Sequence, residues 1–237
     1  MRSTPRPPAW MTALEGRAVG ERLAMRVTRP LLERLPRGDG HAVLVLPGML
    51  TDDRSTEPLR DLLRSLGYRS YGWRQGINLG PTQAIIEGLS RRVDELVERN
   101  TTLSLVGWSM GGMFARAIAR ERPDAIRQVI TLGSPIRLGP PDGDRGPLPV
   151  PTTSVYSRSD GIVHWSASLV KASPRAENVE IIGSHCGLGV NPSVAVVIAD
   201  RLALPEGSWT PFEPPWWLRM NYPTPADFDQ GIASDRR

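Results

Sequence analysis

Ser109 sits in a pattern that is typical of a nucleophile. It is the centre of Gly107-Trp-Ser-Met-Gly111, which follows the apolar run 102–106 and precedes a stretch of small residues. The run predicts a buried strand and the stretch a helix, and glycines suit a turn where the two nearly collide. Such a turn projects the serine from the carboxyl end of a sheet, at a helix N-terminus that favours negative charge. A structural turn serine is the alternative, which the flanking strand and helix disfavour.

A serine hydroxyl needs a base to accept its proton, and the chain holds three histidines. His41 precedes the first buried run, at the wrong end of the expected sheet. His185 follows the expected strand 178–182 in a glycine-rich loop, where a base can reach over the sheet. We therefore predict His185 as the base. His164 is the alternative base, or else a histidine at the rim of the pocket.

A carboxylate that orients the histidine would complete a set of serine, histidine and acid. Asp160 follows the expected strand 153–156, one strand before the histidine loop, so it can hold the imidazole in the required tautomer. Asp142 and Asp144 compete for this role, but they lie in a Pro/Gly-rich loop with no strand to position them. Asp160 could instead be an ordinary turn residue. The chain order of serine, aspartate and histidine favours the catalytic role.

Acyl transfer also needs N–H donors for the oxyanion of the tetrahedral intermediate. We predict the backbone N–H of Met110, directly after the serine, and that of Met49, in the loop after the first buried strand. Gly48 lets this loop pass close to the sheet, whereas Pro47 has no N–H to donate. Candidates for lining a substrate pocket are Leu50, Trp108, Ile136, His164 and Leu188.

Strands that alternate with helices must position these groups. Short apolar runs bounded by turn residues predict strands at 42–46, 69–73, 102–106, 126–132, 153–156 and 178–182. Helical spacing predicts helices at 56–66, 81–100, 111–120 and 192–202, the last capped by Asn191. The alternation predicts an α/β fold with right-handed crossovers and a mostly parallel sheet.

Over residues 42–202 the chain resembles the α/β-hydrolase superfamily, especially small bacterial lipases and esterases. The matching segments are 45–48, 107–112, 131–135, 159–163 and 184–185. The resemblance implies an α/β-hydrolase fold and an acyl-enzyme mechanism on a carboxylic ester, with neither a metal nor an organic cofactor. Trp108 stands where many lipases have histidine or tyrosine, which leaves the acyl preference open. Only the loop 133–152 occupies the place of the helical cap in many relatives, so we expect no large cap domain.

The two ends define the expected organisation: an N-terminal arm at 1–40, the hydrolase core at 41–204 and a Pro/Trp-rich tail at 205–237 packed on the core. An apolar stripe at four-residue steps predicts a helix in the arm that Pro30 interrupts: Val19, Leu23, Val27, Leu31 and Leu35. The first 37 residues carry eight arginines and three glutamates, so the rest of the chain is nearly neutral. The arm or the tail could touch an anionic membrane surface weakly, but we favour a helix and a tail that pack on the domain.

Composition excludes several classes. With 237 residues, 40% hydrophobic and 23% charged, the chain can bury a substantial core, and the single Cys186 excludes a disulfide scaffold or a multi-cysteine zinc site. The net charge of +4 comes from arginines, which we attribute to genome composition rather than to a nucleic-acid partner. No apolar run is long enough to span a bilayer, and no secretory signal is evident, so we expect a cytoplasmic protein.

The expected function is hydrolysis of a small-molecule or lipid-like carboxylic ester by Ser109, Asp160 and His185. The same three residues would serve an acyltransferase or a thioesterase, so these remain alternatives. Two further alternatives come from other classes: a non-catalytic binding protein on a hydrolase scaffold, and a membrane- or nucleic-acid-binding role for the basic arm.

Overall fold

The computed structural model describes residues 5–138 and 146–229 and contains one six-stranded sheet, with strand order β2-β1-β3-β4-β5-β6. Every neighbouring pair of strands is parallel. The strands are β1 (Ala42–Leu46), β2 (Arg69–Gly72), β3 (Leu103–Trp108), β4 (Ile126–Leu132), β5 (Thr152–Tyr156) and β6 (Ala176–Glu180). The predicted α/β fold with a parallel sheet is confirmed, and the described residues hold no large cap domain.

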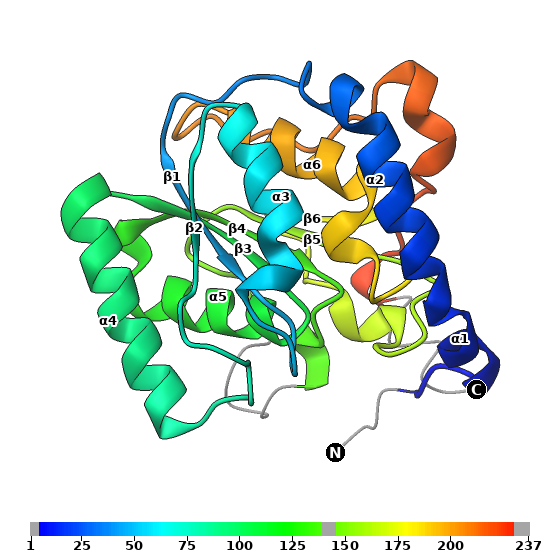
Figure 1. Cartoon of the computed structure of the whole chain (residues 1–237), viewed down its shortest axis with the longest axis horizontal. Coiled ribbons are helices and arrows are strands. Elements are labelled where there is room, and N and C mark those ends of the chain that lie inside the picture. The colour runs from blue at the N-terminus through cyan, green and yellow to red at the C-terminus, as the bar shows by residue number, and fades with distance from the viewer. Residues whose placement is uncertain (1–4, 139–145, 230–237) are drawn as a thin grey trace.

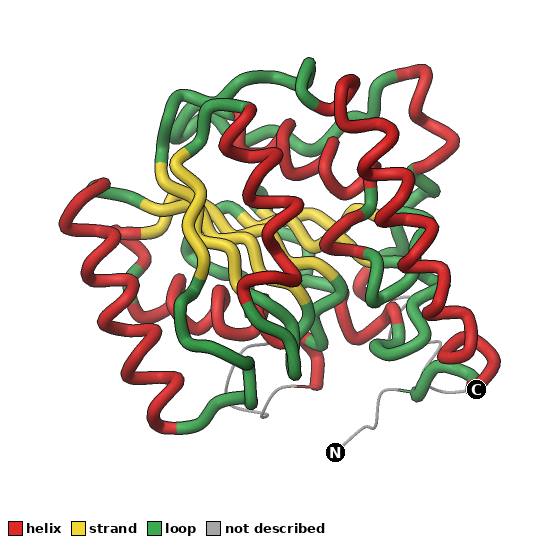
Figure 2. The backbone as a smooth tube through the Cα atoms, in the orientation of Figure 1, coloured by secondary structure: helices red, strands yellow, loops and turns green. Residues whose placement is uncertain are grey.

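Helices cover both faces of this sheet (Figures 1 and 2). The longer helices are α2 (Ala18–Leu32), α3 (Asp53–Ser65), α4 (Gln83–Asn100), α5 (Met110–Glu121) and α6 (Pro192–Ala203). In one core cluster α2, α3 and α6 pack on one face, and in the other α4 and α5 pack on the opposite face. The sheet separates two core clusters because successive side chains of a strand point to opposite faces. In β1, Val43 and Val45 belong to the first cluster, whereas Leu44 and Leu46 belong to the second.

Helix starts are set by side-chain caps, as the sequence predicts for Asn191. Its side chain accepts hydrogen bonds from the N–H groups of Ser193 and Val194, and Asp52 and Thr82 cap α3 and α4 in the same way. Several strand boundaries differ from expectation by one or two residues. Strand β3 continues to Trp108, directly before the serine, and β6 ends at Glu180, two residues earlier than predicted.

The arm is helical and packs on the core, but not through its apolar stripe, and the predicted interruption at Pro30 is wrong. A short α1 (Ala9–Ala13) and a 3-10 turn, η1 (Leu14–Arg17), lead into α2, which runs unbroken through Pro30. The buried face of α2 carries Met25 and Leu32. The stripe residues within the helix are instead 60–77% exposed: Val19, Leu23, Val27 and Leu31.

The described part of the tail returns across the core. Phe212 and Leu218 pack against the first core cluster, and the Tyr222 hydroxyl donates a hydrogen bond to the Ser193 carbonyl at the start of α6. Trp216 and Trp217, in the 3-10 segment η6 (Trp216–Asn221), are exposed. Across residues 5–138 and 146–229, no helix is both long and apolar enough to cross a bilayer.

Candidate active site

Ser109 lies between the end of β3 and the start of α5 in a strained conformation. Its φ of 52° and ψ of −119° are rare for a residue with a side chain. Its N–H donates a 2.8 Å hydrogen bond to the Leu132 carbonyl at the end of β4. The flanking glycines are required by space, because a Cβ on Gly107 would collide with the backbone at the start of α5, and one on Gly111 with the Leu46 carbonyl.

Asp160 and His185 form a buried pair. One carboxylate oxygen, Oδ2, lies 2.6 Å from His185 Nδ1, and the two residues are only 3% and 4% exposed. The other oxygen, Oδ1, accepts hydrogen bonds from the N–H groups of Ile162 at 2.9 Å and Val163 at 2.7 Å. The carboxylate is therefore fixed by its own loop, and it holds the imidazole through Nδ1, which leaves Nε2 for another partner.

The end of β4 brings the serine and this pair together. Leu132 holds the Ser109 N–H, and the next residue, Gly133, lies directly against the pair. A Cβ placed on Gly133 would be 3.1 Å from both Asp160 Oδ2 and His185 Nδ1. The residue before the serine adds a second link, because Trp108 Nε1 donates a 3.0 Å hydrogen bond to the His185 carbonyl.

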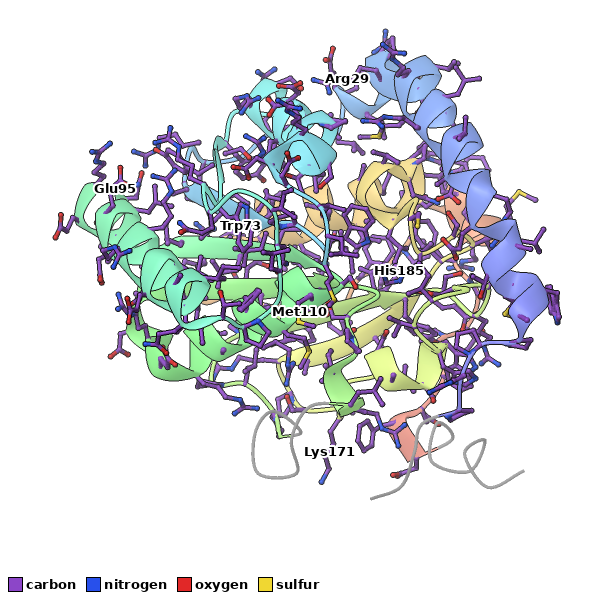
Figure 3. All side chains as sticks on the ribbon, turned by 60° about the horizontal axis from the view of Figure 1, so that its bottom comes forward. Arg29, Trp73, Glu95, Met110, Lys171 and His185 are labelled. Carbon is purple, nitrogen blue, oxygen red and sulfur yellow. The ribbon has the colours of Figure 1, made fainter. Side chains whose placement is uncertain are left out.

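The loop after β1 passes beside the serine. A Cβ on Gly48 would lie 3.5 Å from the Ser109 Cβ. Among the described residues, neither the Met49 N–H nor the Met110 N–H donates a hydrogen bond to the protein, so both are free for a ligand. Met110 and His185 are labelled in Figure 3.

Sequence reasoning missed Asn78, which fixes this loop. Asn78 is fully buried, and its side-chain amide donates to the Pro47 carbonyl at 2.9 Å. Its backbone N–H donates to Thr51, and its carbonyl accepts from the Leu50 N–H, both at 2.8 Å. The sequence around Asn78 shows only an ordinary turn pattern, so nothing local indicates this role.

The five residues predicted to line the substrate pocket do not line one common pocket. Trp108 lines a small pocket of about 170 Å³. Neither Ser109, Asp160 nor His185 is among its other walls, which are Ala18, Val19, Arg22, Ser55, Cys186, Gly189 and Val190. Ile136 packs in a separate small cluster, Leu188 is buried in the first core cluster, and Leu50 is exposed. His164 begins a 3-10 turn, with Nδ1 2.9 Å from the Ser166 hydroxyl. Only Trp108, of the five candidates, lines the small pocket.

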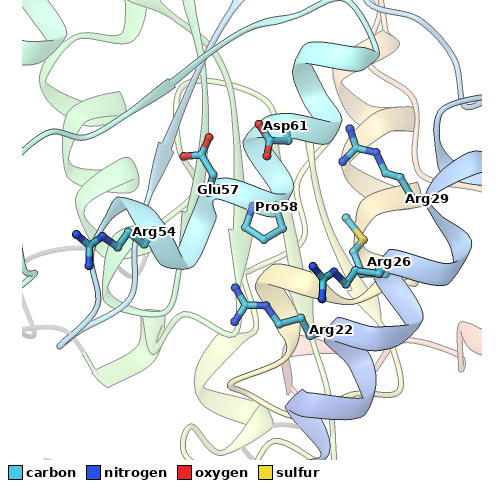
Figure 4. Close-up of a pocket in the computed structure, with 8 residues that line it drawn as sticks. Arg22, Arg26, Arg29, Arg54, Glu57, Pro58 and Asp61 are labelled. Carbon is cyan, nitrogen blue, oxygen red and sulfur yellow. The ribbon is translucent and has the colours of Figure 1, made fainter.

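A larger groove of about 700 Å³ lies between α2 and α3 (Figure 4). Its walls carry four arginines and two carboxylates: Arg22, Arg26, Arg29, Arg54, Glu57 and Asp61. Both carboxylates form ion pairs with arginines of α3 itself, so the groove presents positive charge. Arg22 also lines the small pocket, so the two hollows adjoin.

The remaining candidate groups of the chain, including His41 and Cys186, do not add to this site. His41 is bonded to Asp39 and to Ser104, at the amino end of the strands. The pKa of the Cys186 thiol is raised to about 11, by burial first and then by the Glu15 carboxylate, so it is a poor nucleophile at neutral pH. Asp142 and Asp144 lie outside the described residues, within which no cluster of metal-binding side chains is present.

Comparisons with known proteins agree with this architecture. Residues 82–187 match the family described as "PGAP1-like alpha/beta domain". A search of curated protein sequences found no significant match. The chain is similar in structure to a metagenome-derived lipolytic enzyme of the LipS and LipT study, with 15% identity, a TM-score of 0.54 and coverage of 70% of this chain and 93% of that one.

Two further solved structures are similar. A predicted CIB-like hydrolase from Thermoplasma acidophilum is 19% identical, with a TM-score of 0.53 and coverage of 69% of this chain and 86% of that one. A variant of PytH is 13% identical, with a TM-score of 0.51 and coverage of 68% and 96%. The chain thus shares the fold of these proteins, so the predicted α/β-hydrolase fold is confirmed.

Proposed function

We propose that this protein hydrolyses carboxylic esters through an acyl-enzyme intermediate on Ser109. The observation that carries the proposal is the buried Asp160–His185 hydrogen bond beside a serine held in a strained strand-to-helix turn. An imidazole fixed through Nδ1 can use Nε2 as a general base, and a projecting serine at a helix N-terminus is the matching nucleophile.

In the first half-reaction, Ser109 Oγ attacks the ester carbonyl carbon while His185 Nε2 takes the hydroxyl proton. The free N–H groups of Met49 and Met110 hold the resulting oxyanion, and Asp160 stabilises the imidazolium. As the intermediate collapses, the bond from carbon to the alcohol oxygen breaks, and His185 returns the proton to the leaving alcohol. Water, activated by the same imidazole, then attacks the acyl-enzyme and releases the acid.

The substrate we propose is a small-molecule or lipid-like ester. The small pocket beside Trp108 is mostly apolar and offers room for a short acyl or alcohol group. The lipolytic enzyme among the structural neighbours supports this class, at the level of a shared fold.

We also propose a weak contact between the arm and an anionic lipid surface. The apolar stripe on α2 is exposed to solvent and has no partner in the described structure. It is formed by Val19, Leu23, Val27 and Leu31. Arginines 22, 26 and 29 of the same helix add the positive charge that such a surface attracts (Figure 4). Val19 of the stripe also lines the small pocket, so a lipid surface bound by the stripe would lie close to that pocket.

A p-nitrophenyl ester series of increasing acyl length tests the proposed reaction. We expect turnover of at least one member, and complete loss of turnover in Ser109→Ala with the unfolding temperature nearly unchanged. The series also gives the preferred chain length. Equal rates for wild type and Ser109→Ala would end the proposal, as would the absence of turnover across the series together with failure of Ser109 to react with an active-site phosphonate.

A further inference from the structure

One buried carboxylate of the arm contacts both loops of the candidate site. Glu15, in the turn η1, is 9% exposed. Its Oε1 accepts hydrogen bonds from the N–H of Gly161 at 2.8 Å and of His185 at 3.0 Å, and its Oε2 accepts from the N–H of Cys186 at 2.8 Å. Gly161 directly follows Asp160, so one side chain ties the loop of the acid to the loop of the base.

A second carboxylate holds the base loop from the other side. Glu21, in the first turn of α2, accepts hydrogen bonds from the backbone N–H of Ser184 at 2.8 Å and from its hydroxyl at 2.7 Å. The other oxygen of Glu21 accepts from the Asn191 side-chain amide at 3.1 Å. Ser184 immediately precedes His185, so the base is held on both sides in the sequence.

The acid loop has its own contacts with the arm. The Thr12 hydroxyl donates a 2.7 Å hydrogen bond to the Gly161 carbonyl, and the Arg17 guanidinium donates a 2.8 Å bond to the Ser159 carbonyl. We call Thr12, Glu15, Arg17 and Glu21 the arm clamp. Each member bonds to a residue more than 140 positions away, so the clamp is tertiary structure rather than a local turn.

The electrostatics of Glu15 match this role. Burial raises the pKa of its carboxyl, but the hydrogen bonds from the N–H groups of Cys186, Gly161 and His185 outweigh burial, and the pKa lies below its ordinary value of 4.5. At neutral pH the carboxylate is therefore ionised, and an ionised carboxylate has only acceptors to offer, which suits three converging donors. A glutamine in its place would turn its NH₂ toward at least one of these N–H groups.

We propose that Glu15 and Glu21 are positioning residues, and that the arm clamp sets the orientation of the His185 imidazole toward Asp160 and Ser109. The proposal rests on the proposed function for its effect on turnover. The clamp itself is a statement about loop geometry, which can be measured without any turnover. Neither glutamate touches the reacting atoms, so both act through the backbone of the two loops.

Glu15→Gln tests the clamp, with Glu33→Gln as its matched control. Glu33 lies just after α2 and, within the described part of the chain, pairs only with Arg29 at the surface, so its loss should change little. We expect kcat of Glu15→Gln on the best p-nitrophenyl ester to fall about 10- to 100-fold with KM within about twofold, because misplaced catalytic groups slow chemistry more than binding. Glu21→Gln, which leaves the acid loop attached, should show a smaller loss and serves if Glu15→Gln does not fold.

The backbone N–H groups that donate to Glu15 provide a readout that needs no turnover. They belong to Gly161, His185 and Cys186. Their exchange with deuterium should be at least about tenfold faster in Glu15→Gln and unchanged in Glu33→Gln, because loss of the shared acceptor loosens both loops.

The outcomes separate the two proposals. If kcat and the amide exchange rates of Glu15→Gln and Glu21→Gln all match wild type, the clamp is overturned. If wild type hydrolyses no ester, the proposed function fails, and the exchange rates alone then decide the clamp. If exchange accelerates while kcat stays at the wild-type value, the loops move without consequence and the positioning role is overturned.

Discussion

Ser109 occupies a backbone conformation that only glycine adopts without strain. Its positive φ with a strongly negative ψ costs about 1–3 kcal/mol for a residue with a Cβ. The Leu132 hydrogen bond and the packing of β3 against α5 hold Ser109 in this strained conformation. Strain of this kind at a projecting serine is consistent with a site selected for reactivity rather than for stability.

This strain predicts that removing the Cβ stabilises the fold. Ser109→Gly should be inactive, yet more stable than the equally inactive Ser109→Ala by about 1 kcal/mol, or about 2–4 °C in unfolding temperature. Comparing the two variants isolates the Cβ, because both lack the hydroxyl. Calorimetry of the pair checks this, and a glycine variant that melts below the alanine variant would show that the turn is unstrained.

Gly133 offers a test of the buried pair. Its φ of 57° and the 3.1 Å approach of its position to Asp160 and His185 leave no room for a methyl group. Gly133→Ala should lower kcat/KM at least about 100-fold by displacing the pair. Gly207→Ala is the matched control, because Gly207 also has a positive φ but faces open space. The control should lose only stability, and equal losses of activity in the two variants would contradict our account of the pair.

At the scale of elements, the arm shows where local patterns stop being informative. Four-residue spacing predicts a helix, and the helix forms, but spacing does not say which side packs. The packed side of the helix is decided by burial of Met25 and Leu32 and by the hydrogen bonds of Glu21 to the base loop. That loop is more than 160 residues away from Glu21 in sequence. The arm clamp and Asn78 could not be predicted for the same reason, since their hydrogen-bond partners are distant in sequence.

The elements around the candidate site were more predictable, because their signals are local. Buried strands are continuous apolar runs, and a glycine on each side of Ser109 marks the turn. Asp160 and His185 stand out because each follows a strand, and parallel strands bring their carboxyl ends to one edge. The pocket could not be predicted in this way, because its walls come from the arm, α3 and the base loop together.

The arm clamp also predicts how stability depends on pH. Since the pKa of Glu15 is lower in the folded state than its ordinary value of 4.5, Glu15 stabilises the fold above that pH, and this stability is lost as pH falls through the folded value. Glu15→Gln should therefore be less stable than wild type by about 2 kcal/mol at pH 7, with the difference shrinking as the pH falls below 4.5. Thermal unfolding across this range checks it, and a difference that does not vary with pH would refute the assignment.

At the scale of the whole molecule, the small pocket and the exposed stripe of α2 adjoin, since Val19 belongs to both. A protein held at a lipid surface by this stripe would keep its pocket near that surface. Arg22, Arg26 and Arg29 of α2 point toward the groove that separates α2 from α3 (Figure 4).

Vesicle co-sedimentation tests the proposed lipid contact. We expect wild type to sediment with vesicles that contain anionic lipid, less with neutral vesicles, and much less in 0.5 M salt, because screening weakens charge attraction. Leu23→Glu with Val27→Glu should reduce binding by about fivefold or more. Ile86→Glu on α4 is the control, because Ile86 is also an exposed apolar residue of a helix. Binding that is equal in all three proteins would contradict a role for the stripe.

The central claim is that Ser109 is a nucleophile activated by His185. The most direct measurement is reaction with a fluorophosphonate, followed by mass spectrometry to locate the adduct. We predict one adduct for each chain, on Ser109, with no labelling of Ser109→Ala and much slower labelling of Asp160→Asn, in which the imidazole loses its orienting carboxylate. An absent adduct, an adduct on another residue, or equal labelling of Ser109→Ala would contradict the claim.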